Sequence, residues 1–172
     1  MTMLPTVTSA DGTPIAYEAT NEPPFIVGPG HPPVPSDYVE RVSALVADGK
    51  RSDAVEYFMT EAIGIPAEYL EPMKADPSWE TMTRYAHTLA YDGRTVAGTQ
   101  DGTPLPKDRW SVTAPVHVLV GENSAPFFHE GAQALVDLLP SATYATLPGQ
   151  DHSAFWMAPD AVADSVTRAF TS

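Results

Sequence analysis

His152 is the side chain of this sequence that best suits acid–base chemistry. It lies in the polar loop 148–153, after an apolar strand pattern at 142–147 and before a helix pattern at 159–170. A loop at the carboxyl end of a strand can direct an imidazole into a cleft, and imidazole exchanges protons near neutral pH. The position predicts a histidine that transfers protons. The alternative is a solvated loop histidine that takes no part in chemistry.

A proton-transferring histidine needs a carboxylate that orients its ring. Glu122 and Asp151 follow the two apolar strand patterns of the last third, and Glu22 lies far away in a proline-rich stretch. Asp151 is the weakest of the three candidates, because a side chain next to His152 in sequence tends to point elsewhere. For Glu22 the alternative is a solvated loop carboxylate, since most carboxylates in proteins are solvated.

The sequence has no recognisable nucleophile for covalent catalysis. None of its serines has the Gly-x-Ser-x-Gly spacing that exposes a hydroxyl on a strained strand–helix turn. Ser124 follows a strand pattern, but its neighbours Asn123 and Ala125 do not form such a turn. There is no cysteine, no His-x-x-x-His pair and no glycine-rich phosphate loop. We therefore expect neither a metal nor a cofactor.

The last third of the chain predicts a βαβα unit over 115–172. An apolar strand pattern at 115–121 ends on glycine, and a helix pattern at 126–139 leads to the strand that precedes His152. Two strands joined in this way are expected to be parallel, with a right-handed crossover. The loops at their carboxyl ends, 121–125 and 148–153, would then lie at the same edge of the sheet.

The preceding part of the chain predicts a β-hairpin followed by helices. Residues 5–20 suit a hairpin, because Asp11 and Gly12 give a strong turn signal between two short alternating segments. Residues 36–92 show helix periodicity and predict a helical insert whose apolar faces pack into a core. Three glycines are expected to end helices in this insert: Gly49, Gly64 and Gly93.

Both ends of the chain resemble the α/β-hydrolase superfamily. In that family the last strand runs into a Pro-Gly-x-x-His loop, as in Leu147-Pro-Gly-Gln-Asp-His152, and residues 6–17 resemble the opening hairpin. The resemblance implies an α/β fold with a truncated α/β-hydrolase-like sheet, formed by the opening hairpin and the C-terminal βαβ unit, and a helical cap. The central strands and the nucleophile elbow of the family are missing from the sequence.

The resemblance also implies which residues form the site. In Gly121-Glu-Asn-Ser124 a serine stands where the family often has its acid, and Glu22-Pro-Pro resembles a segment that supplies the acid in some members. His152 and Glu22 are therefore the expected catalytic residues. A substrate pocket under the cap would include Ser124, Phe25, Trp79, Phe127 and Trp156.

Length and charge limit the function further. A chain of 172 residues is expected to form a single domain with a real core. Its net charge of −13 argues against nucleic acids and anionic membrane surfaces as partners, because both carry the same sign. The start of the sequence lacks the pattern of a secretion signal, and no apolar run is long enough to span a membrane. We expect a cytoplasmic protein.

Three functions remain open on these grounds. The first is an enzyme that uses His152 for acid–base chemistry on a small apolar molecule, as a cyclase, isomerase or lyase would. The second is a non-catalytic relative of the hydrolases that binds a small hydrophobic ligand or a partner. The third is a hydrolase fragment completed by another chain. Because a narrow sheet leaves exposed edges, we also expect a homodimer that shares its sheet or exchanges strands.

Overall fold

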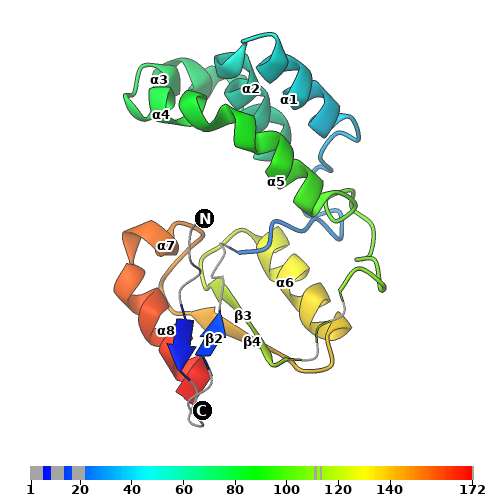
Figure 1. Ribbon diagram of the computed structural model, residues 1–172, viewed down its shortest axis with the longest axis vertical. Helices are drawn as coiled ribbons and strands as arrows, with labels where there is room; N and C mark the ends of the chain where they lie inside the picture. The colour runs from blue at the N-terminus through cyan, green and yellow to red at the C-terminus, as the bar shows by residue number, and fades with distance from the viewer. Residues whose placement is uncertain (1–5, 9–13, 17–21, 111, 113, 172) are drawn as a thin grey trace. The chain divides into compact units, whose positions relative to one another are not determined.

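The computed structural model describes residues 6–8, 14–16, 22–110, 112 and 114–171. Its contacts divide the chain into two compact units (Figure 1). The first, here called the sheet unit, comprises residues 1–23 and 108–172, and the second, the helical unit, comprises residues 24–107. The helical insert expected over 36–92 lies within the second unit, together with the loop segments on either side of it.

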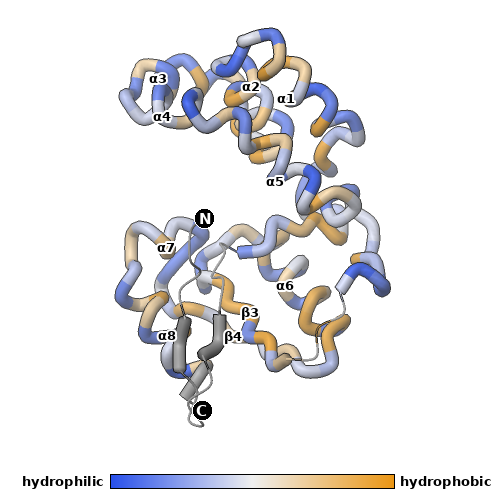
Figure 2. Tube along the Cα trace, in the orientation of Figure 1, coloured by the Kyte–Doolittle hydropathy of each residue, from blue (hydrophilic) through white to orange (hydrophobic). Residues whose placement is uncertain are grey.

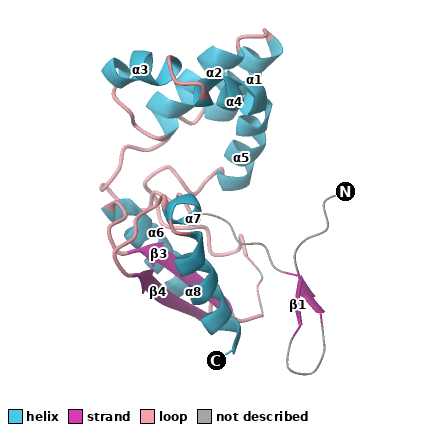
Figure 3. Cartoon of the chain, turned by 90° about the vertical axis from the view of Figure 1, so that its left-hand side faces the viewer, coloured by secondary structure: helices cyan, strands magenta, loops and turns pink. Residues whose placement is uncertain are grey.

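The sheet unit contains the expected βαβα arrangement. Strands β3 (Val116–Gly121) and β4 (Ala142–Leu147) are parallel, with Val116 opposite Ala142 and Gly121 opposite Leu147. Helix α6 (Pro126–Leu138) connects the two strands, and α8 (Pro159–Thr171) follows them. The sheet lies between α6 and α8 (Figures 1 and 3). The prediction of parallel strands joined by a helix is confirmed, and β4 has its expected bounds.

The apolar residues of β3 explain why α6 packs on the sheet. Val118 and Val120 are buried on the face that meets Phe128 and Ala132 of α6. Figure 2 shows this apolar stretch of β3 in orange. Burial of a valine side chain contributes about 1.5–3 kcal/mol, so this cluster holds the helix against both strands. Pro126 stands at the start of α6, where a missing N–H costs no helix hydrogen bond.

The opening hairpin has two short antiparallel strands. They are β1 (Thr6–Thr8) and β2 (Pro14–Ala16), with Val7 opposite Ile15. The predicted turn at Asp11 and Gly12 lies outside the described residues.

The helical unit consists of short helices around one apolar core. That core contains Val42, Val55, Leu70 and Trp79, which are almost completely buried. None of the described helices is long and apolar enough to cross a membrane. The elements in chain order are α1 (Tyr38–Ala47), α2 (Arg51–Tyr57), a π-helix (Phe58–Ala62), a 3-10 turn (Ala67–Tyr69), α3 (Leu70–Lys74), α4 (Ser78–Tyr85), a second 3-10 turn (Ala86–Thr88) and α5 (Leu89–Val96).

Glycines end two of these helices as expected, but a third does not. Gly49 and Gly64 have φ values of 77° and 80°, which glycine adopts at no steric cost. The expected helix end at Gly93 is wrong, because α5 continues to Val96. Gly93 instead allows close packing: a Cβ at this position would lie 2.9 Å from Cε1 of Tyr38 in α1. The glycine at position 93 therefore marks the crossing of α5 with α1 and not the end of a helix.

Backbone hydrogen bonds join the two ends of the helical unit. The N–H of Ile26 donates to the carbonyl of Thr99 at 2.8 Å, and the N–H of Gly102 donates to the carbonyl of Ile26 at 2.9 Å. The N–H of Val34 donates to the carbonyl of Gln100 at 2.9 Å. The segments that enter and leave the helices therefore lie side by side.

Candidate acid–base site

The carboxyl ends of β3 and β4 place two loops against each other. The N–H of Glu122 donates to the carbonyl of Leu147 at 3.0 Å, and the N–H of Asn123 donates to the carbonyl of Gln150 at 2.8 Å. These bonds extend the pairing of the parallel strands by one step into the loops. The loop after β3 is thus fixed beside the loop that carries His152.

Gly121 allows this close approach. A Cβ at Gly121 would lie 2.7 Å from the Cα of Asp151 and 2.8 Å from the carbonyl oxygen of Gln150. Real Cβ atoms do not approach backbone atoms so closely, so a side chain here would push the two loops apart. The glycine that ends β3 is therefore part of the site.

Glu22 and His152 meet in these loops although 130 residues separate them. The Oε2 atom of Glu22 lies 2.9 Å from Nδ1 of His152. The Glu22 side chain is only 8% exposed, whereas the His152 side chain is 40% exposed. The carboxylate thus lies behind the imidazole, and the ring can still be reached from solvent.

The other oxygen of Glu22 accepts two more hydrogen bonds. The N–H of Gly121 donates to Oε1 at 2.5 Å, and the hydroxyl of Ser124 donates to the same atom at 2.7 Å. Ser124 is itself buried, with 8% of its surface exposed. Three donors from two loops therefore converge on one carboxylate.

These contacts keep Glu22 ionised. Burial by itself would raise the pKa of Glu22, but the hydrogen bonds from His152, the Gly121 N–H and Ser124 together lower that pKa below its ordinary value. An ionised carboxylate only accepts hydrogen bonds, so Nδ1 of His152 must be the donor. In the neutral imidazole, Nε2 is then the nitrogen that takes up a proton.

The two other candidate carboxylates bond elsewhere. Asp151 accepts hydrogen bonds from the N–H and the hydroxyl of Ser153, at 2.8 and 2.6 Å, and these bonds lower its pKa. Glu122 accepts a hydrogen bond from the N–H of Gly149 at 2.7 Å. Both carboxylates stabilise the loops around His152, and Glu22 is the one that contacts its ring.

Comparisons with known proteins bear on the family and the fold of the chain. No protein-family model and no curated protein matches the chain. Among solved structures, the chain is similar to an α/β hydrolase from Sphaerobacter thermophilus, with 41% sequence identity and a TM-score of 0.71. The chain belongs to the α/β-hydrolase superfamily. The similarity covers 87% of this chain but only 56% of that hydrolase, so the chain has a truncated α/β-hydrolase-like fold with a helical cap. Within the described residues the opening hairpin and the pair β3–β4 form two separate sheets, and not the single sheet that was expected.

An aromatic residue of this hydrolase-like fold packs on the histidine and was not predicted. The ring of Phe128 lies 4.2 Å from the imidazole of His152, between ring centres, with the two planes 18° apart. The ring centre of Phe127, a predicted pocket residue, lies 4.0 Å from the ring centre of Phe128. The sequence gives Phe128 only as one apolar position of a helix. Its contact with His152 depends on the crossing of α6 over the strand ends.

The predicted pocket residues of the hydrolase-like chain are divided between the two units. Ser124, Phe127 and Trp156 belong to the sheet unit, and Phe25 and Trp79 belong to the helical unit. Trp156 is 61% exposed and lies in α7 (Ala154–Met157), a short helix that the sequence patterns did not indicate. Phe25 is buried. Trp79 is buried in the core of its unit, and its indole N–H donates to the Ser52 hydroxyl at 2.9 Å.

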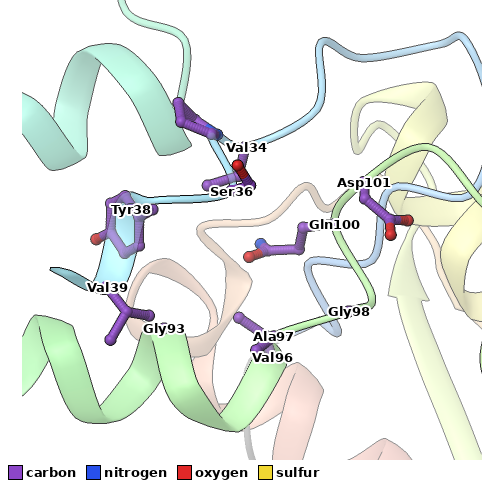
Figure 4. A pocket seen from close by; sticks show the side chains of 11 residues that line it. Val34, Ser36, Tyr38, Val39, Gly93, Val96, Ala97, Gly98, Gln100 and Asp101 are labelled. Atoms are coloured by element: carbon purple, nitrogen blue, oxygen red, sulfur yellow. The ribbon is translucent and has the colours of Figure 1, made fainter. Parts of the chain in front are cut away.

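The helical unit has a pocket of its own at the crossing of α1 and α5 (Figure 4). It has a volume of about 200 Å³, and Tyr38, Gly93 and Gln100 are among the residues that line it. None of the five predicted pocket residues lines it. Gln100 is held in place by its side-chain amide, which donates to the carbonyl of Pro24 at 2.9 Å.

The described residues show no candidate metal centre. Nowhere in these ranges do three or more His, Asp or Glu side chains come together in a way that could hold a metal ion.

Proposed function

We propose that this α/β-hydrolase relative catalyses proton transfer on a small apolar molecule, with His152 as the general base or acid and Glu22 as the residue that orients it. The contact of 2.9 Å between Glu22 Oε2 and His152 Nδ1 carries the proposal. Cyclisation, isomerisation and elimination are reactions of this kind, because each needs a positioned substrate and a group that moves a proton.

The position of Ser124 argues against acyl-enzyme chemistry. A serine nucleophile must give its proton to the imidazole, which in turn is oriented by the acid. The hydroxyl of Ser124 instead donates directly to the acid, Glu22, and the residue is buried. The proposed reaction therefore does not use Ser124 as a nucleophile.

The surroundings of His152 favour an apolar substrate. Phe128 covers one face of its imidazole. The loop that carries His152 continues into α7, where Phe155 and Trp156 are 48% and 61% exposed. Aromatic rings near a base exclude water and bind apolar molecules.

A proton-abstraction probe tests the proposal without knowledge of the natural substrate. Nitrobenzisoxazole is a small apolar molecule: a base removes its ring C–H proton, the N–O bond breaks, and a coloured cyanonitrophenolate forms. We expect the protein to catalyse this reaction. Replacing His152 by glutamine should lower the rate about a hundredfold or more, and Glu22→Gln should lower it by a smaller factor, because the base remains but loses its orienting partner.

The matched control for this experiment is His129→Gln. His129 is a partly buried histidine of α6 whose Nδ1 lies 2.7 Å from the hydroxyl of Tyr144, so its hydrogen-bond partner is Tyr144 and not Glu22. This variant should keep the rate of the parent protein. Equal rates for the parent protein and His152→Gln would count against catalysis and favour the non-catalytic, ligand-binding alternative.

A second candidate function is that of a hydrolase fragment whose active site is completed by another chain. The chain spans only 56% of the hydrolase that it resembles, and β3 and β4 form a sheet of two strands within the described residues. Successive N–H groups along a strand point to opposite sides. The N–H of Val116 donates to the carbonyl of Ser141 on the side of β4, so the N–H of Leu119, three residues further on, points away from β4. Under this alternative a second copy adds its strand at that edge. Sedimentation velocity at several protein concentrations tests this alternative. A protein that stays monomeric at all concentrations and is active on nitrobenzisoxazole would exclude a site completed by a second chain.

A further inference from the structure

We propose that Ser124 is a positioning residue: its hydroxyl holds the carboxylate of Glu22 in the orientation that presents Oε2 to Nδ1 of His152. This inference rests on the proposed acid–base role of the Glu22–His152 pair. It gives Ser124 a function in the site that is neither that of a nucleophile nor that of a surface contact with substrate.

The hydrogen bonds at Oε1 of Glu22 fix the rotation of its carboxylate. The last torsion of a glutamate side chain has a broad energy profile, so one hydrogen bond at one oxygen does not fix the plane of the carboxylate. In this protein Oε1 accepts two bonds, from the N–H of Gly121 and the hydroxyl of Ser124. Two donors in different directions do fix the plane. With Oε1 held in this way, Oε2 is directed at His152.

The turn after β3 holds the two donors to Oε1 in fixed positions. The N–H of Ser124 donates to the carbonyl of Gly121 at 3.0 Å, so both residues belong to one closed turn after β3. Gly121 is in turn packed against the backbone at Asp151. Because α6 begins at Pro126, two residues after Ser124, the turn is anchored by a strand on one side and a helix on the other.

Burial makes the Glu22 carboxylate sensitive to the loss of the Ser124 hydroxyl. Ser124 is 8% exposed, and the side chain of Glu22 is equally buried. A buried carboxylate that loses one donor cannot replace it freely with water, so its proton affinity must change. A serine that merely filled space in the turn would have no such effect on Glu22 or on the tautomer of His152.

The experiment compares Ser124→Ala, Ser124→Thr and Glu22→Gln by NMR. The carboxyl carbon of Glu22 reports its ionisation, and the ring nitrogens of His152 report whether the neutral imidazole carries its proton on Nδ1 or Nε2. In Ser124→Ala we expect the pKa of Glu22 to rise by about one pH unit, since a hydrogen bond to a charged group changes proton affinity roughly tenfold. The fraction of His152 with the proton on Nδ1 should fall. Ser124→Thr retains the hydroxyl and should restore both signals.

Ser43→Ala is the control, because the hydroxyl of Ser43 donates to the carbonyl of Val39 in α1 at 2.6 Å and not to Glu22. It should leave the Glu22 titration and the His152 tautomer unchanged. Ser124→Cys provides a second variant of nearly the same size as serine, and its weak S–H donor should give values between those of serine and alanine.

The outcomes separate this inference from the proposed function. If Ser124→Ala leaves Glu22 and His152 unchanged while Glu22→Gln alters the tautomer, Ser124 has no positioning role but the Glu22–His152 pair stands. If Glu22→Gln leaves the tautomer of His152 unchanged, the pair itself has no influence on the ring, and the proposed function fails. Loss of the Nδ1–H tautomer in both Ser124→Ala and Glu22→Gln supports the inference.

Discussion

Glu22 depends on residues far along the chain for its place and its charge. Its three hydrogen-bond donors, Gly121, Ser124 and His152, lie 99, 102 and 130 residues further on. Two of these donors stand at the end of β3, and the third follows β4. Whatever displaces the end of β3 therefore changes the carboxylate and the imidazole together.

Gly121→Ala tests whether the Glu22–His152 pair depends on the position of the end of β3, because it adds one carbon atom there. The added Cβ would lie 2.7 Å from the Cα of Asp151, and backbone atoms cannot yield as a flexible side chain would. We expect a stability loss of about 1–3 kcal/mol, as is usual for overpacked sites, and separation of Glu22 from His152. Activity on nitrobenzisoxazole should fall to the level of Glu22→Gln. Chemical denaturation and the probe reaction measure the two effects.

The control for Gly121→Ala is Gly149→Ala in the neighbouring loop. Gly149 has a φ of 69°, so alanine is strained there, but its Cβ would meet no atom within 4 Å. Both variants should lose stability, and only Gly121→Ala should alter the His152 tautomer. A normal tautomer in Gly121→Ala would mean that the loops can separate without disturbing the pair.

At the scale of elements, the sequence predicts strands and helices well where one period dominates. The pattern of β4 gives its bounds at 142–147 without error, and α6 ends one residue before its expected end. Helix α7 was missed because four residues are too few to show a helical period, and its start depends on hydrogen bonds from Ser153 to Asp151. Gly93 was misread because a glycine at a helix crossing and a glycine at a helix end look alike in sequence.

Of the contacts around His152, one could be predicted from the sequence and two could not. The nearness of Glu22 to His152 could be predicted only through the family resemblance, because spacing alone says nothing across 130 residues. The bond from Ser124 to Glu22 and the stacking of Phe128 on His152 could not be predicted. They depend on how α6 lies over the ends of β3 and β4, and that geometry follows from packing and not from local pattern.

The crossing of α1 and α5 gives a prediction at this scale. Gly93→Ala should gain about 1 kcal/mol of helix propensity but lose more through contact with the Tyr38 ring, which is buried and stacks on Tyr57 with ring centres 5.8 Å apart. Overpacking typically costs about 1–3 kcal/mol, so we expect a net loss of about 1 kcal/mol. Urea denaturation followed by circular dichroism measures it.

A double variant checks the cause of that loss. Tyr38→Leu removes the ring atom that the new Cβ would contact. In the Tyr38→Leu background, Gly93→Ala should therefore cost less than in the parent protein, with the remaining cost due to Cγ2 of Val39, which would lie 3.0 Å from the new Cβ. Equal costs in both backgrounds would show that Tyr38 is not the obstacle.

At the scale of the whole chain, the helical unit has the form of an insertion. It is one continuous segment, 24–107, whose core is formed by its own helices. Its two ends are joined by backbone hydrogen bonds between Ile26 and both Thr99 and Gly102. Glu22 lies immediately before this segment and His152 well after it, so the candidate site belongs to the sheet unit alone.

This arrangement predicts that residues 24–107 fold without the rest of the chain. Segments whose ends lie together and whose core is internal usually fold alone. The excised segment should give a helical circular dichroism spectrum and a cooperative thermal transition.

Val42→Asp should abolish the transition, because Val42 is completely buried in this core and an unpaired charge there costs several kcal/mol. A broad, non-cooperative transition in the unsubstituted segment would mean that the helices need the rest of the chain for their stability.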